Sequence, residues 1–90
     1  MSQTITVKMY SRPGCGYCAA ARQLLQKKGI DFQDINISGD PRLRREMEEL
    51  SGGYTVPQIF IGDKAIGGYD DMAELEQNGK LGELLNGKSS

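Results

Sequence analysis

Ninety residues, two cysteines and no histidine narrow what this chain can be. The length allows one small domain built around one hydrophobic core. The 11 basic and 12 acidic residues leave a net charge of −1, which gives no electrostatic reason to expect nucleic acid or an anionic membrane as the main partner.

The sequence has no segment typical of secretion or membrane insertion. No apolar run approaches the roughly 20 residues that a membrane-spanning helix needs. The N-terminal M-S-Q-T-I-T-V-K lacks the basic region and the long apolar region of a secretory signal, and two cysteines are too few for a secreted disulfide scaffold. We therefore expect a cytoplasmic protein, or an organelle protein if a targeting segment has been removed.

Apolar patterning predicts four strands. The first two cover residues 5–10 (I-T-V-K-M-Y) and 32–37 (F-Q-D-I-N-I), which alternate or are rich in β-branched residues. The last two, Gln58–Ile61 and Lys64–Gly67, flank Gly62-Asp63 and are therefore expected to form a β-hairpin.

Apolar spacing and end signals predict the helices. The first ends in Lys27-Lys28-Gly29, and its apolar face holds Cys18, Ala21 and Leu25. The second begins at Asp40-Pro41 and ends at Ser51-Gly52-Gly53, and it is expected to bury Leu43, Met47 and Leu50.

The third helix is expected to begin with Asp71 as an acidic cap paired with Glu74. Leucines that follow it predict either a short terminal helix or a continuation past Gly79: Leu81, Leu84 and Leu85.

The element order β-α-β-α-β-β-α predicts an α/β fold with one four-stranded mixed sheet and helices on both faces. The first two strands are joined by a helix and should be parallel, with a right-handed crossover. No repeat or linker interrupts the chain, so we expect a single domain over residues 1–90, with a core at about 5–85 and a polar tail at 86–90.

Both cysteines lie in R-P-G-C-G-Y-C, residues 12–18, where the first strand leads into the first helix. Three structural explanations are open. A closed zinc site needs four ligands, but the chain has two thiols and no imidazole. A disulfide that closes so short a loop would constrain the unfolded chain little. Inert burial suits Cys18, but not Cys15, which stands between two glycines.

A redox pair explains the placement of Cys15 and Cys18 better. The exposed N–H groups and the dipole at a helix N-terminus favour thiolate at Cys15, and Arg12 could add positive charge. Cys18 lies one helical turn further on, on the same face. Because C-x-x-C near a β-α-β pattern is a redox signal, we predict that Cys15 is the attacking thiol and Cys18 the buried resolving thiol.

Two loops and three arginines suggest a groove beside these thiols. Pro57, in Thr55-Val56-Pro57, is either an ordinary strand-entry proline or a cis proline that turns the Val56 backbone towards an extended peptide. The segment 67–71 is either a hairpin exit with a helix cap or a carboxylate site at helix N–H groups. Arg12, Arg44 and Arg45 are either solvated surface charges or residues of which one or two bind a second carboxylate of a ligand.

Three motifs, C-G-Y-C, T-V-P-Q-I-F-I-G and I-G-G-Y-D-D, occur in the order and spacing of a known family. From Ile5 to about Leu85 the chain resembles a dithiol glutaredoxin, of the thioredoxin-like superfamily. The resemblance implies a glutathione-dependent thiol–disulfide oxidoreductase that reduces protein–glutathione mixed disulfides and small disulfides. Its implied partners are glutathione, as co-substrate, and proteins that carry glutathione or disulfides; nucleic acid and membrane are not expected.

The resemblance also implies roles for particular residues. Cys15 would be the nucleophile and Cys18 the resolving cysteine. Arg12 would help to bind the glycine carboxylate of glutathione, and Arg44 would have a similar task. The full set implied to bind glutathione is Arg12, Tyr17, Arg44, Thr55, Val56, Pro57 (with a cis peptide bond), Gly68, Tyr69, Asp70 and Asp71.

Gly16 keeps a second function open. Many dithiol members of the family have proline at this position, and some members without it hold a [2Fe-2S] cluster between two chains. The nucleophilic cysteine and bound glutathione are the cluster ligands there. The alternative to a monomeric enzyme is therefore a cluster carrier or sensor, a glutathione-bridged dimer with Cys15 as a ligand; no metal is expected in the monomer.

Overall fold

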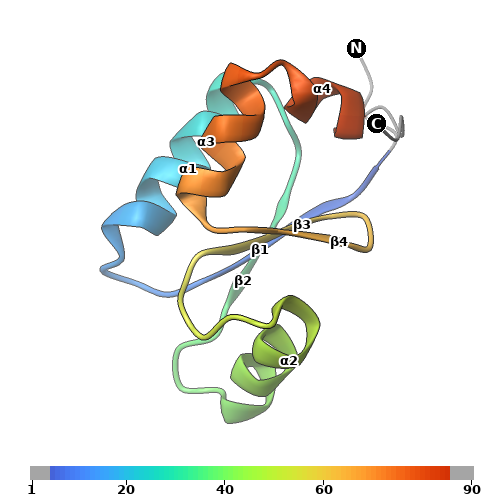
Figure 1. Ribbon diagram of the computed structural model, residues 1–90. Coiled ribbons are helices and arrows are strands. Elements are labelled where there is room, and N and C mark those ends of the chain that lie inside the picture. Colours follow the sequence, from blue (N-terminus) through green and yellow to red (C-terminus); the bar gives the residue numbers. More distant parts are fainter. Residues whose placement is uncertain (1–4, 86–90) are drawn as a thin grey trace.

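The computed structural model describes residues 5–85, and the predicted tail at 86–90 lies outside this range. A four-stranded sheet has helices on both faces (Figure 1). Within the described residues no helix has the length and apolar character to cross a membrane. In chain order the elements are β1 (Val7–Ser11), α1 (Gly16–Lys27), β2 (Gln33–Asn36), α2 (Pro41–Ser51), β3 (Gln58–Ile61), β4 (Lys64–Gly67), α3 (Tyr69–Gln77) and α4 (Lys80–Leu85).

The sheet is mixed, with the strand order β2-β1-β3-β4. β1 is parallel to β2 and antiparallel to β3, and β3 and β4 form the antiparallel hairpin. This confirms the predicted fold class and element order. The hairpin strands have the predicted bounds, whereas β1 begins and ends later than predicted and β2 is shorter than predicted.

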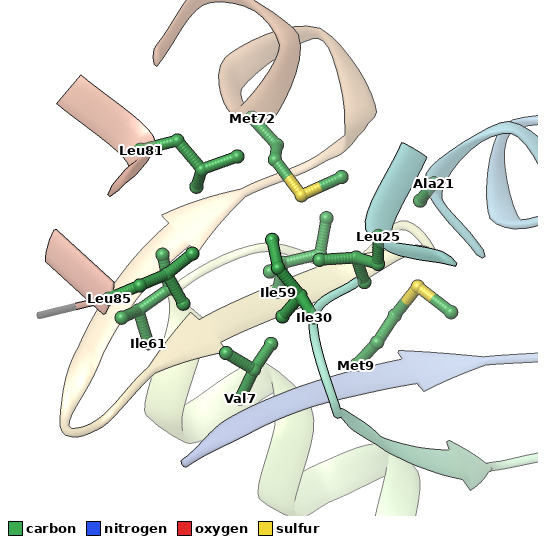
Figure 2. Close-up of a cluster of buried hydrophobic side chains, with 10 residues drawn as sticks. All are labelled: Val7, Met9, Ala21, Leu25, Ile30, Ile59, Ile61, Met72, Leu81 and Leu85. Carbon is green, nitrogen blue, oxygen red and sulfur yellow. The ribbon is translucent and has the colours of Figure 1, made fainter. Parts of the chain in front are cut away.

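The larger core lies between the sheet and the layer of α1, α3 and α4 (Figure 2). Alternate strand residues point into it, since side chains along a strand alternate between the two faces. The helices contribute the residues that their apolar spacing predicts. The buried members are Val7, Met9, Ala21, Leu25, Ile30, Ile59, Ile61, Met72, Leu81 and Leu85.

A smaller core lies on the opposite face, under α2. It contains Tyr10, Ile37, Met47 and Phe60, and the rings of Tyr10 and Phe60 meet edge-on with centroids 5.6 Å apart. The Tyr10 hydroxyl donates a hydrogen bond to Glu46 Oε2 at 2.5 Å. Burial is the largest cause, and the Glu46 carboxylate the next, of the rise in the pKa of Tyr10 to about 12. The phenol therefore remains protonated and connects α2 to the sheet as a hydrogen-bond donor.

The prediction that Leu50 is buried is wrong. Leu50 is 60% exposed, whereas Met47, one turn earlier, is fully buried. In the described part of the chain α2 is the only helix on this face of the sheet (Figure 1). Because no second helix packs beside it, the last turn of α2 has no apolar partner for Leu50, although the spacing is right.

The predicted start of the third helix is also wrong. α3 begins at Tyr69, and Gly68 occupies the N-cap position. Asp71 is therefore the third helical residue, and its Oδ2 accepts a hydrogen bond from Gly68 N at 3.0 Å. Asp71 fills the acidic position of a capping box whose cap residue has no side chain. The terminal leucines form the separate short helix α4.

The topology gathers three chain segments at one end of the sheet. β1 ends beside the start of β3, where Tyr10 pairs with Gln58. β4 ends at the same place, because Gly67 pairs with Ile59. The loop that leads to α1, the loop before β3 and the start of α3 consequently meet there.

We predict that Gly67→Ala destabilises the protein more than Gly79→Ala does. Both glycines have positive φ, +113° and +72°, so each alanine strains the backbone. A Cβ on Gly67 would also lie 2.3 Å from Asp71 Oδ2, whereas one on Gly79 meets nothing within 4 Å. The alanine at Gly67 must therefore displace the Asp71 cap, at an additional cost of about 1 kcal/mol. Urea unfolding of both variants measures the difference, and equal losses would contradict this role of Asp71.

Candidate active site

Cys15 occupies the N-cap position of α1. Its backbone is extended, with φ −99° and ψ 113°, and its sulfur accepts a hydrogen bond from Cys18 N at 3.2 Å. A helix N-terminus needs such an acceptor because its first N–H groups have none within the helix. The first turn of α1 contains no acidic residue, so no neighbouring carboxylate opposes a negative charge on the sulfur.

Several groups set the pKa of the Cys15 thiol. Burial raises it, but three hydrogen bonds from Cys18 and Tyr17, together with the charge of Arg12, lower it below its ordinary value. Cys15 is partly exposed to solvent. A partly exposed thiol with a lowered pKa is the kind of cysteine that acts as a nucleophile.

Cys18 has the opposite environment one turn below. It is fully buried. Burial is the largest cause, and the hydrogen bond with Cys15 the next, of the rise in its pKa to about 11. It therefore remains a neutral thiol at physiological pH. Both cysteines are free, and the two pKa directions assign them different chemistry.

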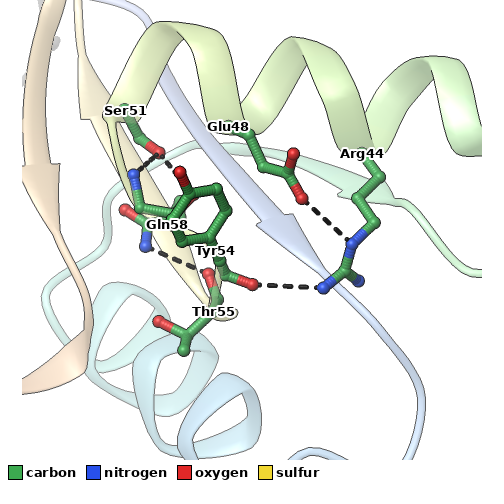
Figure 3. Close-up of polar contacts among 7 residues, drawn as sticks. Arg44, Glu48, Ser51, Tyr54, Thr55 and Gln58 are labelled. Carbon is green, nitrogen blue, oxygen red and sulfur yellow. Dashed lines mark hydrogen bonds and ion pairs between the residues drawn. The ribbon is translucent and has the colours of Figure 1, made fainter.

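The loop before β3 lies against Cys15. The sulfur of Cys15 is 3.8 Å from the carbonyl oxygen of Val56, and the Val56–Pro57 peptide bond is cis. Buried Gln58 supports the loop from below, because its side-chain amide donates to the Thr55 carbonyl at 3.0 Å (Figure 3). Sequence reasoning missed this role of Gln58, for which its position directly after Pro57 is the only signal.

A groove of about 580 Å³ runs beside this loop. Its walls come from the first turn of α1, the end of α2, the loop before β3 and the start of α3. Eight of the residues predicted to bind glutathione line it: Tyr17, Thr55, Val56, Pro57, Gly68, Tyr69, Asp70 and Asp71. Gly67, from the segment 67–71 interpreted as a possible carboxylate site, also lines it, and sequence reasoning did not assign the other lining residues, which are Ser51, Gly52, Gly53 and Gln58.

Two tyrosines form one wall of the groove. The rings of Tyr17 and Tyr69 lie with centroids 6.5 Å apart and planes tilted by 33°. Tyr17 is 63% exposed, which leaves much of its ring available to a ligand. Behind Tyr69, the geometry of α3 leaves its first N–H groups without an intrahelical acceptor.

Arg12 and Arg44 stand apart from the other predicted residues. They line a separate depression of about 370 Å³ beside the loop before α2. Arg44 also has protein partners: Nε lies 3.2 Å from Glu48 Oε2, and Nη2 donates to the Tyr54 carbonyl at 3.2 Å (Figure 3). In this structure Arg44 connects α2 to the loop before β3.

Comparison with known proteins agrees with this geometry. The glutaredoxin family model matches residues 7–66. A glutaredoxin of Pseudomonas aeruginosa is 50% identical over 80 residues, which are 89% of this chain and 95% of the relative. Glutaredoxin 3 of Escherichia coli is 46% identical over 79 residues, 88% of this chain and 95% of the relative. The chain belongs to the glutaredoxin family.

Solved glutaredoxin structures share the whole fold. The solution structure of glutaredoxin from Brucella melitensis superposes with a TM-score of 0.84 at 49% identity, covering 99% of this chain and 98% of the other. The crystal structure of a buckwheat glutaredoxin–glutathione complex also has a TM-score of 0.84, at 30% identity, covering 94% and 80%. As a glutaredoxin, the chain is an oxidoreductase that acts on thiols and disulfides with glutathione.

We predict that a thiol-alkylating reagent modifies Cys15 and spares Cys18. The reagent reacts with thiolate, and Cys15 has the lowered pKa and the exposure. Its rate against pH should level off at an apparent pKa below the usual cysteine value of about 8.5. Mass spectrometry after timed iodoacetamide labelling gives the rates.

The control is Cys15→Ser, which leaves the buried thiol alone. Burial is the largest cause of the raised pKa of Cys18 and remains in this variant, so labelling should be slower than for an ordinary exposed cysteine at pH 7. Fast labelling of Cys18 in the native protein would show that the two thiols do not differ as described.

Proposed function

We propose that this glutaredoxin reduces protein–glutathione mixed disulfides through Cys15, and small or protein disulfides through Cys15 and Cys18 together. The observation that carries the proposal is the contrast between the two sulfurs. Cys15 is partly exposed with a lowered pKa, and Cys18 is buried with a raised one. Only one of them is ready to attack an incoming disulfide.

The mixed-disulfide reaction needs one protein thiol. The Cys15 thiolate attacks the glutathione sulfur, the protein substrate leaves as a thiolate, and a disulfide forms between Cys15 and glutathione. A second glutathione thiolate then attacks the glutathione sulfur of that disulfide, which yields oxidised glutathione and restores the Cys15 thiolate. Each step forms one S–S bond and breaks one.

The groove supports a place for glutathione. The backbone of Val56, beside Cys15, suits an extended peptide that pairs with it as a strand would. The N-terminus of α3 combines N–H groups at Tyr69 and Asp70 with two carboxylates, at Asp70 and Asp71. That combination fits the carboxylate and the ammonium of a γ-glutamyl group.

The glycine end of glutathione would then point towards Arg12. Arg12 is exposed and lines the depression on the other side of the thiols. Gly68 contributes less directly, because its N–H already bonds to Asp71. Arg44 would have to release Glu48 or Tyr54 to bind a carboxylate.

We predict that Cys15→Ser abolishes glutathione-dependent reduction of a mixed disulfide, whereas Cys18→Ser keeps most of it. Without Cys15 no nucleophile remains, so the rate should fall by more than about 100-fold. Without Cys18 a second glutathione still completes the cycle. The assay follows NADPH consumption with glutathione reductase and a glutathionylated peptide, and circular dichroism checks that both variants are folded. Similar losses in both variants would refute these roles.

The second candidate, a [2Fe-2S] carrier or sensor, needs more than one chain. Among the described residues no group of three or more histidine, cysteine, aspartate or glutamate side chains is placed to hold a metal. One chain therefore does not fit the cluster. Its remaining support is Cys15, which is partly exposed, beside Gly16, where a Cβ would meet no atom within 4 Å.

We predict a colourless monomer after anaerobic incubation with iron, sulfide and glutathione. Visible absorbance together with a dimer on gel filtration, both lost in Cys15→Ser, would instead establish the cluster-bound form. A Gly16→Pro variant is the matched comparison, because proline suits the first position of a helix and the space beside Gly16 is open.

A further inference from the structure

Arg22 joins three elements behind the thiols. Its Nε lies 2.6 Å from Asp34 Oδ2, and its Nη2 donates to Ser11 Oγ at 3.2 Å. The Ser11 hydroxyl in turn donates to Asp34 Oδ1. The network of Ser11, Arg22 and Asp34 therefore ties α1 to the end of β1 and to β2.

Residues of this network, or next to it in sequence, lie on two sides of Cys18. Arg22 follows Cys18 by four residues on α1, which places it one turn away on the same face. On the other side, the backbone N–H of Arg12 bonds to the Cys18 sulfur, and Arg12 directly follows Ser11. The groups that hold Arg22 consequently also hold the strand end that contacts Cys18.

An isolated surface ion pair would need no function. Exposed pairs typically contribute less than about 1 kcal/mol, and the Arg22 and Asp34 side chains are 32% and 34% exposed. Here, however, Ser11 is 1% exposed and hydrogen-bonds to both partners. The guanidinium is thus anchored at the edge of the core, and it interacts electrostatically with Cys18 more strongly than with Cys15.

We propose that Arg22, held by Asp34 and Ser11, is a positioning residue for Cys18 that speeds disulfide closure. The inference rests on the proposed roles of the two cysteines. In the closure step Cys18 attacks the Cys15 sulfur of a Cys15–substrate disulfide. The Cys15–Cys18 bond forms, the bond to the substrate sulfur breaks, and the departing thiolate takes up the proton that Cys18 loses. Reduction of a mixed disulfide by Cys15 alone does not include this step.

The other charged groups near Cys18 do not replace Arg22. Cys15 raises the pKa of Cys18 when it is a thiolate, but in the mixed disulfide it has no charge. Asp34, from β2, is paired with Arg22 at 2.6 Å and is not among the groups that shift the pKa of Cys18. α3 presents the phenol of Tyr69, which meets Tyr17 at the first turn of α1. Arg22 is the cation whose charge lowers the pKa of Cys18.

The test measures closure directly in Arg22→Gln and Arg22→Lys. Reduced protein is mixed with oxidised glutathione at pH values from 6 to 10, and the reaction is quenched with acid at set times. Mass spectrometry then quantifies the glutathionylated intermediate and the closed disulfide separately. For Arg22→Gln we expect closure to slow by about three- to tenfold at neutral pH, with the pH profile shifted upwards, because one pKa unit is a tenfold change in thiolate. Arg22→Lys keeps the charge and should restore most of the rate.

Two controls separate this role from a general effect on the fold. Lys28→Gln removes another ion pair, between Lys28 at the C-cap of α1 and Glu76 at 2.8 Å, at the end of the helix away from the cysteines, and should leave closure unchanged. Arg22→Gln in the Cys18→Ser background should leave reduction of mixed disulfides unchanged.

The outcomes distinguish the two proposals. Unchanged closure and an unshifted profile in Arg22→Gln would overturn the role of Arg22, as would an equal loss of the Cys15-only reaction. If Arg22→Gln does not fold, Arg22→Met removes the charge in its place: a pH profile shifted upwards supports the role of Arg22, and an unshifted profile overturns it. Failure of the native protein to form the glutathionylated intermediate would instead refute the proposed function.

Discussion

One hydrogen bond, from the Cys18 backbone N–H to the Cys15 sulfur at 3.2 Å, joins the start of helix α1 to the reactivity of the protein. The first N–H groups of a helix need acceptors, and a thiolate accepts better than a thiol. The geometry that begins the helix therefore also favours the ionised nucleophile. It places the second thiol one turn deeper, where the sheet and the helices exclude water.

The fold places segments that are distant in sequence beside the cysteine motif. The end of β1 lies between the end of β2 and the start of β3, so the cysteine loop meets the Val56 carbonyl from a segment about 40 residues away in sequence. The hairpin returns the chain to the same end, where α3 begins. Buried side chains on both faces of the sheet fix these loops relative to one another. The groove is therefore a product of strand order more than of any single loop.

The features predicted correctly are those that neighbouring residues in the sequence determine. The hairpin around Gly62-Asp63 and the cap at Asp40 have the expected positions, and so does the pair of cysteines at a strand–helix junction. Leu50 shows where such reasoning stops: its helical spacing is correct, but no second helix among residues 5–85 packs beside α2 on that face, and Leu50 is exposed. The cap of α3 is a second case: Gly68 occupies the N-cap position without a side chain that could signal it, and the acidic signal comes from Asp71, three residues later. Arg22 acts through partners on other segments, and no sequence period reports such contacts.

The two thiols make conflicting demands on a single helical turn. Cys15 needs solvent and hydrogen-bond donors, whereas burial of Cys18 protects it from side reactions but raises its pKa to about 11 and so weakens it as a nucleophile. A charge inside the core that relieved this would itself be costly to bury. The position four residues further along the helix avoids that cost, since it lies at the rim of the core and still faces Cys18. A partly exposed arginine, fixed by a carboxylate and a buried hydroxyl, is the type of side chain that can act from there.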